Sequence, residues 1–225
     1  MKIAVLGTGT VGRALAGRLS ELGHDVTVGT RDVTATLARQ TPDGMGNPPF
    51  AQWLTAHPAV ALAPIAQAVA GVELVVNATS GDASIAALEA GRAGLDGAIV
   101  LDIANPLDFS RGMPPTLLVK DTDSLGEQIQ AAFPQARVVK ALNTMTAALM
   151  VNPELVADGD HSAFVSGNDA DAKAVVVGLL KSFGHTDVID LGDITTARGT
   201  EMVLPIWLRL MGALGTSMFQ LKIVR

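Results

Sequence analysis

A glycine-rich turn near the start of the chain has the residue types and spacing that bind a pyrophosphate. Its residues fit the pattern G-x-G-x-x-G and are Gly7, Thr8, Gly9, Thr10, Val11 and Gly12. In such turns the first glycine permits a tight bend, the second lets phosphate approach the backbone, and the third lets a helix pack closely on a strand. An apolar strand is expected before the turn and an amphipathic helix after it, whose free N–H groups would face the phosphates. We therefore expect these six residues to bind a dinucleotide.

The end of the second expected strand, at residues 28–32, carries the side chains that distinguish NAD from NADP. At this corner an acid bonds a free ribose 2′-hydroxyl, whereas an arginine accommodates a 2′-phosphate. Thr30 and Arg31 come first here, and Asp32 follows. Arg31 can fork onto a phosphate and Thr30 can donate to it. Asp32 could bind the ribose hydroxyl of NAD, or it could cap the helix expected from Val33. Because Arg31 and Thr30 precede this acid, we predict NADP(H).

Three asparagines follow three further expected strands. Asn77 comes after the strand at 72–76, Asn105 after 97–102 and Asn143 after 136–140. Ligands of doubly wound sheets bind at the carboxyl ends of the strands, so we predict that the three amides share one crevice. For each asparagine taken alone, ordinary turn chemistry is the alternative.

No pair of side chains forms an evident acid–base, nucleophilic or metal-binding centre. His24 and His185 each follow a glycine after a helix and are expected at the surface. Arg198 and Glu201 lie one helical turn apart, and either they pair with each other or one of them reaches the crevice or a partner chain. We assign no catalytic residue and no metal, and expect redox cofactors to supply the chemistry.

Short apolar strands alternate with helical segments, which predicts parallel strands joined by helical crossovers. Strands are expected at 2–6, 25–29, 59–63, 72–76, 97–102, 136–140, 162–166 and 186–190, and helices at 10–22, 33–40, 82–90, 123–133, 169–183 and 194–217. The predicted fold is α/β: a Rossmann-type, doubly wound, mostly parallel sheet with a small C-terminal α/β unit that ends in a long apolar helix. The expected domains are 1–142, which binds the dinucleotide, and 143–225.

Residues 41–58 interrupt this alternation. Their first half is rich in proline and glycine and cannot continue a helix. Phe50, Trp53 and Leu54 then recur at helical spacing, which predicts a short helix that covers core. The alternative is a flap near the adenosine end of a cofactor.

Composition limits the class of partner. A net charge of -6, two Trp and no Tyr among 225 residues speak against a nucleic-acid partner. The absence of cysteine excludes disulfides and thiolate metal sites and is compatible with a cytoplasmic protein. The start of the chain has no signal-peptide pattern.

The segment Met202–Leu221 is almost wholly apolar, but Pro205 and Arg209 interrupt it. A central arginine is costly in a bilayer, so we expect a buried helix and no membrane contact. Apolar residues surround this helix, and one face would be covered by a second copy of the chain or, alternatively, by the 41–58 segment and the tail Lys222 to Arg225. We therefore predict a homodimer built on the C-terminal helix.

Four segments in the same order resemble the F420-dependent NADP reductase family. They are G-T-G-T-V-G, G-T-R-D, V-V-K-A-L-N-T and L-G-D-I-T-T-A-R-G-T-E-M. The NADPH-binding reductase domains of metalloreductases are similar. The resemblance implies an NADPH-dependent oxidoreductase that transfers hydride between NADP(H) and the deazaflavin coenzyme F420, in a cleft between the dinucleotide domain and a small C-terminal domain that binds the acceptor.

The resemblance also implies roles for individual residues. Thr8 to Val11 would hold the pyrophosphate, and Thr30 with Arg31 the 2′-phosphate. The residues implied at the ribose and nicotinamide are Asn77, Ala78, Thr79, Ser80, Ile103 and Ala141, and those facing the hydride acceptor are Asn143 and Thr144. A flavin, a quinone or a ferric chelate stays open as the acceptor. Two other functions also stay open: an NADP-dependent dehydrogenase or imine reductase of a small substrate, and a non-catalytic NADP(H)-sensing protein.

Overall fold

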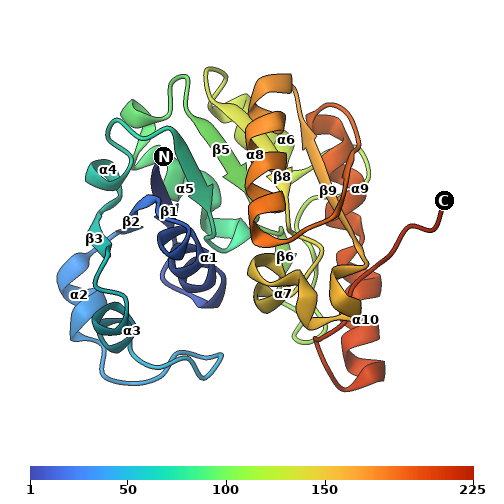
Figure 1. Ribbon diagram of the computed structural model, residues 1–225, viewed down its shortest axis with the longest axis horizontal. Helices are drawn as coiled ribbons and strands as arrows, with labels where there is room; N and C mark the ends of the chain where they lie inside the picture. Colours follow the sequence, from blue (N-terminus) through green and yellow to red (C-terminus); the bar gives the residue numbers. More distant parts are fainter.

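One eight-stranded sheet runs through the chain, and the computed structural model describes all 225 residues (Figure 1). The strands are β1 (Lys2–Leu6), β2 (Asp25–Thr30), β3 (Val60–Pro64), β4 (Leu74–Asn77), β5 (Ile99–Asp102), β8 (Arg137–Ala141), β9 (Ser162–Gly167) and β10 (Asp187–Asp190). Their order in space is β10-β9-β8-β5-β4-β1-β2-β3, and only the β8–β9 pair is antiparallel. The predicted Rossmann-type, mostly parallel sheet is confirmed.

Helices cover both faces of the sheet (Figure 1). They are α1 (Thr10–Glu21), α2 (Val33–Ala38), α3 (Phe50–Ala56), α4 (Ile65–Ala68), α5 (Ser84–Glu89), α6 (Leu125–Ala132), α7 (Ala147–Val151), α8 (Ala170–Phe183), α9 (Ala197–Met202) and α10 (Leu204–Leu214). The short helices α4 and α7 were not predicted. A two-strand hairpin of β6 (Leu107–Asp108) and β7 (Thr116–Leu117) was not predicted either. Segments this short carry no readable period.

Two apolar layers hold the sheet between the helices. In one layer, Leu15 and Leu19 of α1 and Leu180 of α8 pack on strand residues such as Val5. In the other, α4, α5 and α6 pack on the opposite face. Because both faces are covered, the strands are almost uniformly apolar, which is the pattern that made them readable in the sequence.

The carboxyl ends of β1, β4, β5 and β8 meet at one rim of the sheet. Ala141, the last residue of β8, pairs with Val165, so the antiparallel β9 begins at this same rim with Ser162. The predicted domain boundary at residues 142/143 therefore falls between two neighbouring strands of one sheet. The division into two domains stays a prediction.

The helix expected at 194–217 is divided into a 3-10 turn at Ile194–Thr196, then α9, then α10. Pro205 lies in the first turn of α10 and has no N–H group to continue the bonding of α9, which explains the break. None of the helices combines the length and apolarity that crossing a bilayer requires.

Candidate functional site

The glycine turn joins β1 to α1 as predicted. A Cβ atom on Gly7 would lie 2.4 Å from the carbonyl oxygen of Ala78, and one on Gly12 would lie 2.1 Å from that of Gly7. Neither position can carry a side chain. A Cβ on Gly9 would meet nothing within 4 Å, and Gly9 caps α1 without any side-chain hydrogen bond. The first N–H groups of α1 are therefore open to an anion beside Gly9.

At the end of β2, the structure assigns Asp32 to the helix that follows. Its Oδ1 accepts a hydrogen bond of 2.9 Å from the backbone N–H of Ala35, so Asp32 caps α2. Thr30 Oγ1 lies 2.8 Å from Thr36 Oγ1, and Thr36 donates to the Asp32 carbonyl, so the Thr30 proton points to Thr36. Arg31 is exposed and keeps its guanidinium donors free. Of the two uses that the sequence left open for Asp32, the cap is the one observed.

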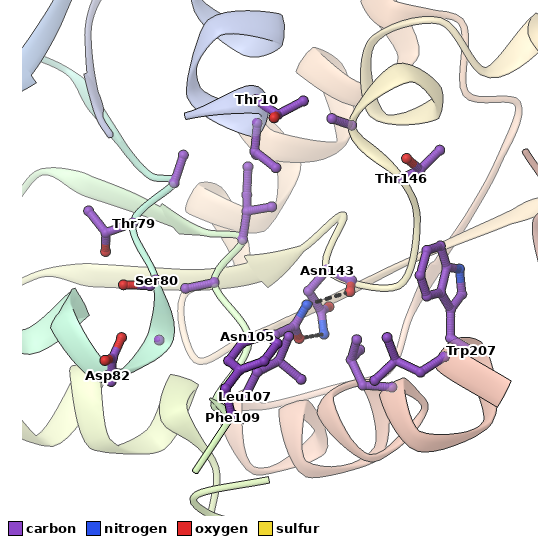
Figure 2. Close-up of a pocket in the computed structure, with 18 of the residues that line it drawn as sticks. Thr10, Thr79, Ser80, Asp82, Asn105, Leu107, Phe109, Asn143, Thr146 and Trp207 are labelled. Atoms are coloured by element: carbon purple, nitrogen blue, oxygen red, sulfur yellow. Dashed lines mark hydrogen bonds between the residues drawn. The ribbon is translucent and has the colours of Figure 1, made fainter. Parts of the chain in front are cut away.

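A cavity of about 730 Å³ opens at the rim, between the glycine turn and α10 (Figure 2). Apolar side chains from three places form much of its wall: Met145, Ala147 and Met150 around α7, Leu107, Phe109 and Leu118 around the hairpin, and Leu204, Trp207 and Leu208 of α10. In Figure 2, Thr79 and Trp207 lie on opposite sides of the view, with Asn105 and Asn143 between them. A volume of this size suits a cofactor-sized ligand.

Eight of the predicted site residues line this cavity. They are Thr10, Val11, Ala78, Thr79, Ser80, Ile103, Asn105 and Asn143. Asn77, Ala141 and Thr144 do not line it, and all three are almost fully buried. The other predicted residues lie in the glycine turn or at the end of β2. The binding role of the whole set stays a prediction.

Two of the three asparagines form a reciprocal bridge at the cavity (Figure 2). Asn105 Nδ2 donates to the carbonyl oxygen of Asn143 over 2.8 Å, and Asn143 Nδ2 donates to Asn105 Oδ1 over 3.1 Å. Asn77 instead donates to Asp102 Oδ1 over 2.8 Å, with its side chain fully buried. The shared crevice predicted for all three therefore contains only two of them.

A buried ion network, which the sequence analysis did not find, lies beneath these residues. The Lys140 ammonium is 2.8 Å from Asp102 Oδ2 and 2.8 Å from Glu201 Oε1, and all three side chains are almost fully buried. Lys140 also donates to the carbonyl oxygen of Ala104, a residue of the cavity wall. Burial alone would lower the pKa of Lys140, but the two carboxylates outweigh it and hold that pKa above its ordinary value.

Backbone donors compensate the second negative charge of the network. Glu201 accepts hydrogen bonds from the N–H groups of Leu125 and Gly126, at 2.9 and 3.1 Å, in the first turn of α6. The positive end of the α6 dipole adds to this stabilisation. Arg198 does not reach Glu201; it binds Glu127, with Nε 2.8 Å from Oε2. The ion pair considered between Arg198 and Glu201 is therefore wrong, because Glu201 faces the core.

His161 and His185 are buried, and both contact α7 or the residues just after it. Their Nε2 atoms each lie 3.0 Å from a carbonyl oxygen, that of Pro153 for His161 and that of Met150 for His185. Burial lowers the pKa of His185. The surface position expected for His185 is wrong, because it docks on the segment that carries Met150 into the cavity wall.

The 41–58 segment reaches both the core and the glycine turn. Phe50 is buried and packs with Trp53 of α3 on the core, so the predicted short helix is confirmed. The loop before α3 passes below α1 in Figure 1, and its Asn47 bonds Thr10. Met45 of the same loop lines the cavity.

A family model and a solved structure that resemble this chain both name coenzyme F420 and NADP. The model of the family "NADP oxidoreductase coenzyme F420-dependent" matches residues 2–106. A crystal structure from Arthrobacter sp. FB24, named as a candidate F420-dependent NADP reductase, is 68% identical with a TM-score of 0.97, and each chain covers 100% of the other.

Two curated relatives match over part of their own length. Metalloreductase STEAP3 of Rattus norvegicus is 29% identical over 92% of this chain and 38% of its own. The F420-dependent NADP reductase of Methanocaldococcus jannaschii is 32% identical over 50% of each protein. The chain thus spans half or less of the length of these two relatives.

Proposed function

Because the chain belongs to the family of coenzyme F420-dependent NADP oxidoreductases, we propose that it transfers hydride between NADP(H) and a deazaflavin or flavin-like acceptor. The observation that carries the proposal is a continuous cavity that begins at the glycine turn with Thr10 and ends on the apolar wall of Leu204 and Trp207. One end suits a dinucleotide, and the other suits a flat ring.

The arrangement fits a reaction between two cofactors. Hydride transfer requires the donor and acceptor carbons to be held about 3–3.5 Å apart, and it needs no protein acid or base if both reacting rings are cofactors. The ionisable side chains that line the cavity are Asp82 and Asp108, at the end near the hairpin and η1 (Gly81–Ala83). The protein's part is to position the rings and to exclude water with its apolar wall.

The preference for NADP(H) rests on the corner after β2. The Asp32 carboxylate is engaged in capping α2, whereas the Arg31 guanidinium is exposed with free donors. The cap commits Asp32 Oδ1 to the backbone of α2, and a free guanidinium binds a phosphate bidentately.

On the acceptor side, no lysine or arginine lines the cavity. A ring would therefore be recognised inside the cavity by shape and apolar contact, and any anionic tail would lie outside it. This supports a flavin-like ring as an alternative to coenzyme F420 in the same position.

The deciding experiment follows the absorbance of oxidised F420 during incubation with NADPH, with NADH, FMN and FAD in parallel. We expect F420 to be reduced by NADPH and not by NADH. Fast turnover with a flavin and none with F420 would reassign the acceptor. Tight binding of NADPH without oxidation by any acceptor would instead identify a sensing protein. Trp207→Ala should raise the KM for the acceptor and leave NADPH binding unchanged.

The proposal extends to assembly. Ile206 and Leu214 of α10 are 54% and 56% exposed in one chain, although both are apolar. A second copy that presents the same helix would cover them, as in most soluble homo-oligomers. The homodimer and the cytoplasmic location expected from the sequence are parts of this proposal.

A further inference from the structure

The turn at residues 43–48 contacts the glycine turn through one side chain. Asn47 Nδ2 donates to Thr10 Oγ1 over 2.6 Å. Thr10 is the first residue of α1, lies inside the G-x-G-x-x-G run, and lines the cavity. Its hydroxyl makes no other hydrogen bond and is exposed.

The orientation of the Asn47 amide is set by Asp43. Both oxygens of the Asp43 carboxylate accept from Asn47 Nδ2, at 3.1 and 2.9 Å, and Oδ1 also accepts from the backbone N–H groups of Met45 and Asn47. The hydrogen bond from the Asn47 side chain holds the pKa of Asp43 below its ordinary value, so this carboxylate is ionised and only accepts. The amide nitrogen must therefore face Asp43, and its second N–H points to Thr10.

Arg13 keeps the two turns together. Its Nε donates to the carbonyl oxygen of Thr8 over 2.8 Å, and its Nη1 donates to that of Pro48 over 2.5 Å. The guanidinium lies over the Phe50 ring, 5.3 Å from its centre, and Arg13 is 7% exposed. The buried Arg13 side chain thus bonds both turns and fixes the position of Asn47 relative to the glycine turn.

We propose that Asn47, oriented by Asp43, is a positioning residue that fixes the Thr10 hydroxyl as a hydrogen-bond donor to the pyrophosphate of the bound dinucleotide. Because the Thr10 oxygen already accepts from Asn47, its own proton is free to point to a phosphate oxygen. With one of its lone pairs occupied by the Asn47 amide, the hydroxyl presents its proton to an anion beside the glycine turn. The inference rests on the proposed function, since it takes the dinucleotide to lie at the glycine turn.

The test measures NADPH binding by fluorescence titration, with no acceptor present. Thr10→Val should weaken binding about tenfold, the loss of one hydrogen bond to a charged group, whereas Thr10→Ser should retain affinity. Asn47→Asp should weaken binding about tenfold or more, because the new carboxylate can donate to neither Asp43 nor Thr10 and adds negative charge beside the glycine turn. Gln40→Glu places the same charge on an exposed residue of the preceding segment and should bind NADPH normally.

Two further measurements are a double-mutant cycle between Asn47 and Thr10 and the binding of a fragment of NADPH. Asn47→Ala should weaken binding a few-fold, and Asn47→Ala combined with Thr10→Val should bind like Thr10→Val alone. Adenosine 2′-monophosphate lacks the pyrophosphate, so its affinity should not change in any of these variants. Additive losses in the cycle, normal NADPH binding by Asn47→Asp, or equal losses for the fragment would each overturn the proposal. Failure of the wild type to bind NADPH would overturn the proposed function with it, whereas wild-type binding with an additive cycle would reject only this inference.

Discussion

Replacing Lys140 by methionine tests whether the buried network holds the floor of the cavity. The substitution keeps a side chain of similar length and leaves the Asp102 and Glu201 carboxylates facing each other with no ammonium between them. Both carboxylates are almost fully buried. Breaking a buried ion pair from one side costs about 3–5 kcal/mol, and we expect a loss of this size in the free energy of unfolding.

Hydrogen-bond donors that remain after the substitution limit this loss. Asp102 keeps its bonds from Asn77 and the Ala104 N–H group, and Glu201 keeps two N–H groups of α6. The loss should therefore lie toward the lower end of that range, at about 3 kcal/mol.

The assay is urea unfolding followed by tryptophan fluorescence, with Lys222→Met as the matched control. Lys222 pairs with Asp160 at the surface, where their side chains are 42% and 71% exposed, so its replacement should cost less than about 1 kcal/mol. A loss below about 1 kcal/mol for Lys140→Met would show that the two buried carboxylates do not depend on the ammonium between them.

Four further predictions follow from the site. Arg31→Glu should raise the KM for NADPH about ten- to hundredfold and leave that for NADH equal or lower, because a carboxylate repels the 2′-phosphate; unchanged discrimination in steady-state kinetics would exclude Arg31 from that contact. Gly12→Ala should lower the melting temperature, since its Cβ would lie 2.1 Å from a carbonyl oxygen, whereas Gly9→Ala should keep the melting temperature and lose NADPH binding; the opposite pattern in thermal-shift assays would contradict the geometry. Because burial lowers the pKa of His185, the folded state favours the neutral ring: the stabilisation is complete above the unfolded pKa of about 6.5 and is lost as pH falls through the lower folded pKa. His185→Gln should flatten that fall in urea unfolding, and an equally steep fall would place its cause elsewhere. Ile206→Glu should convert a dimer to a monomer in light scattering at micromolar concentration, and a dimer that persists would place the interface away from α10.

The strands could be predicted from the sequence because each is an apolar run bounded by polar or glycine residues, and burial on both faces produces that pattern. The glycine turn was equally readable, since Gly7 and Gly12 are each required by a close backbone contact. The sequence did not decide whether Asp32 caps α2 or binds a ribose. Capping depends on where α2 begins, and the sequence gives that position only within a residue or two.

The buried network and part of the site could not be predicted. A lysine within the apolar run V-V-K-A-L indicates a buried charge, but its partners Asp102 and Glu201 are distant in the chain and nothing local selects them. Asn77 was expected at the cavity because it ends a strand. The sequence gives the end of a strand but not the face to which its last side chain points, and here that side chain bonds Asp102.

The antiparallel pairing of β9 with β8 has a consequence for the order in which the protein is made. When synthesis has reached Ala141, six strands of the large sheet are present, and β8 lies at its edge with its outer N–H and C=O groups unpaired. Buried residues such as Val138 and Val139 make this edge apolar, and an apolar edge recruits strands from other chains. The edge closes only when residues 162–167 arrive. A shortened chain that ends between Ala141 and Ser162 should therefore aggregate, even though it carries the whole glycine turn.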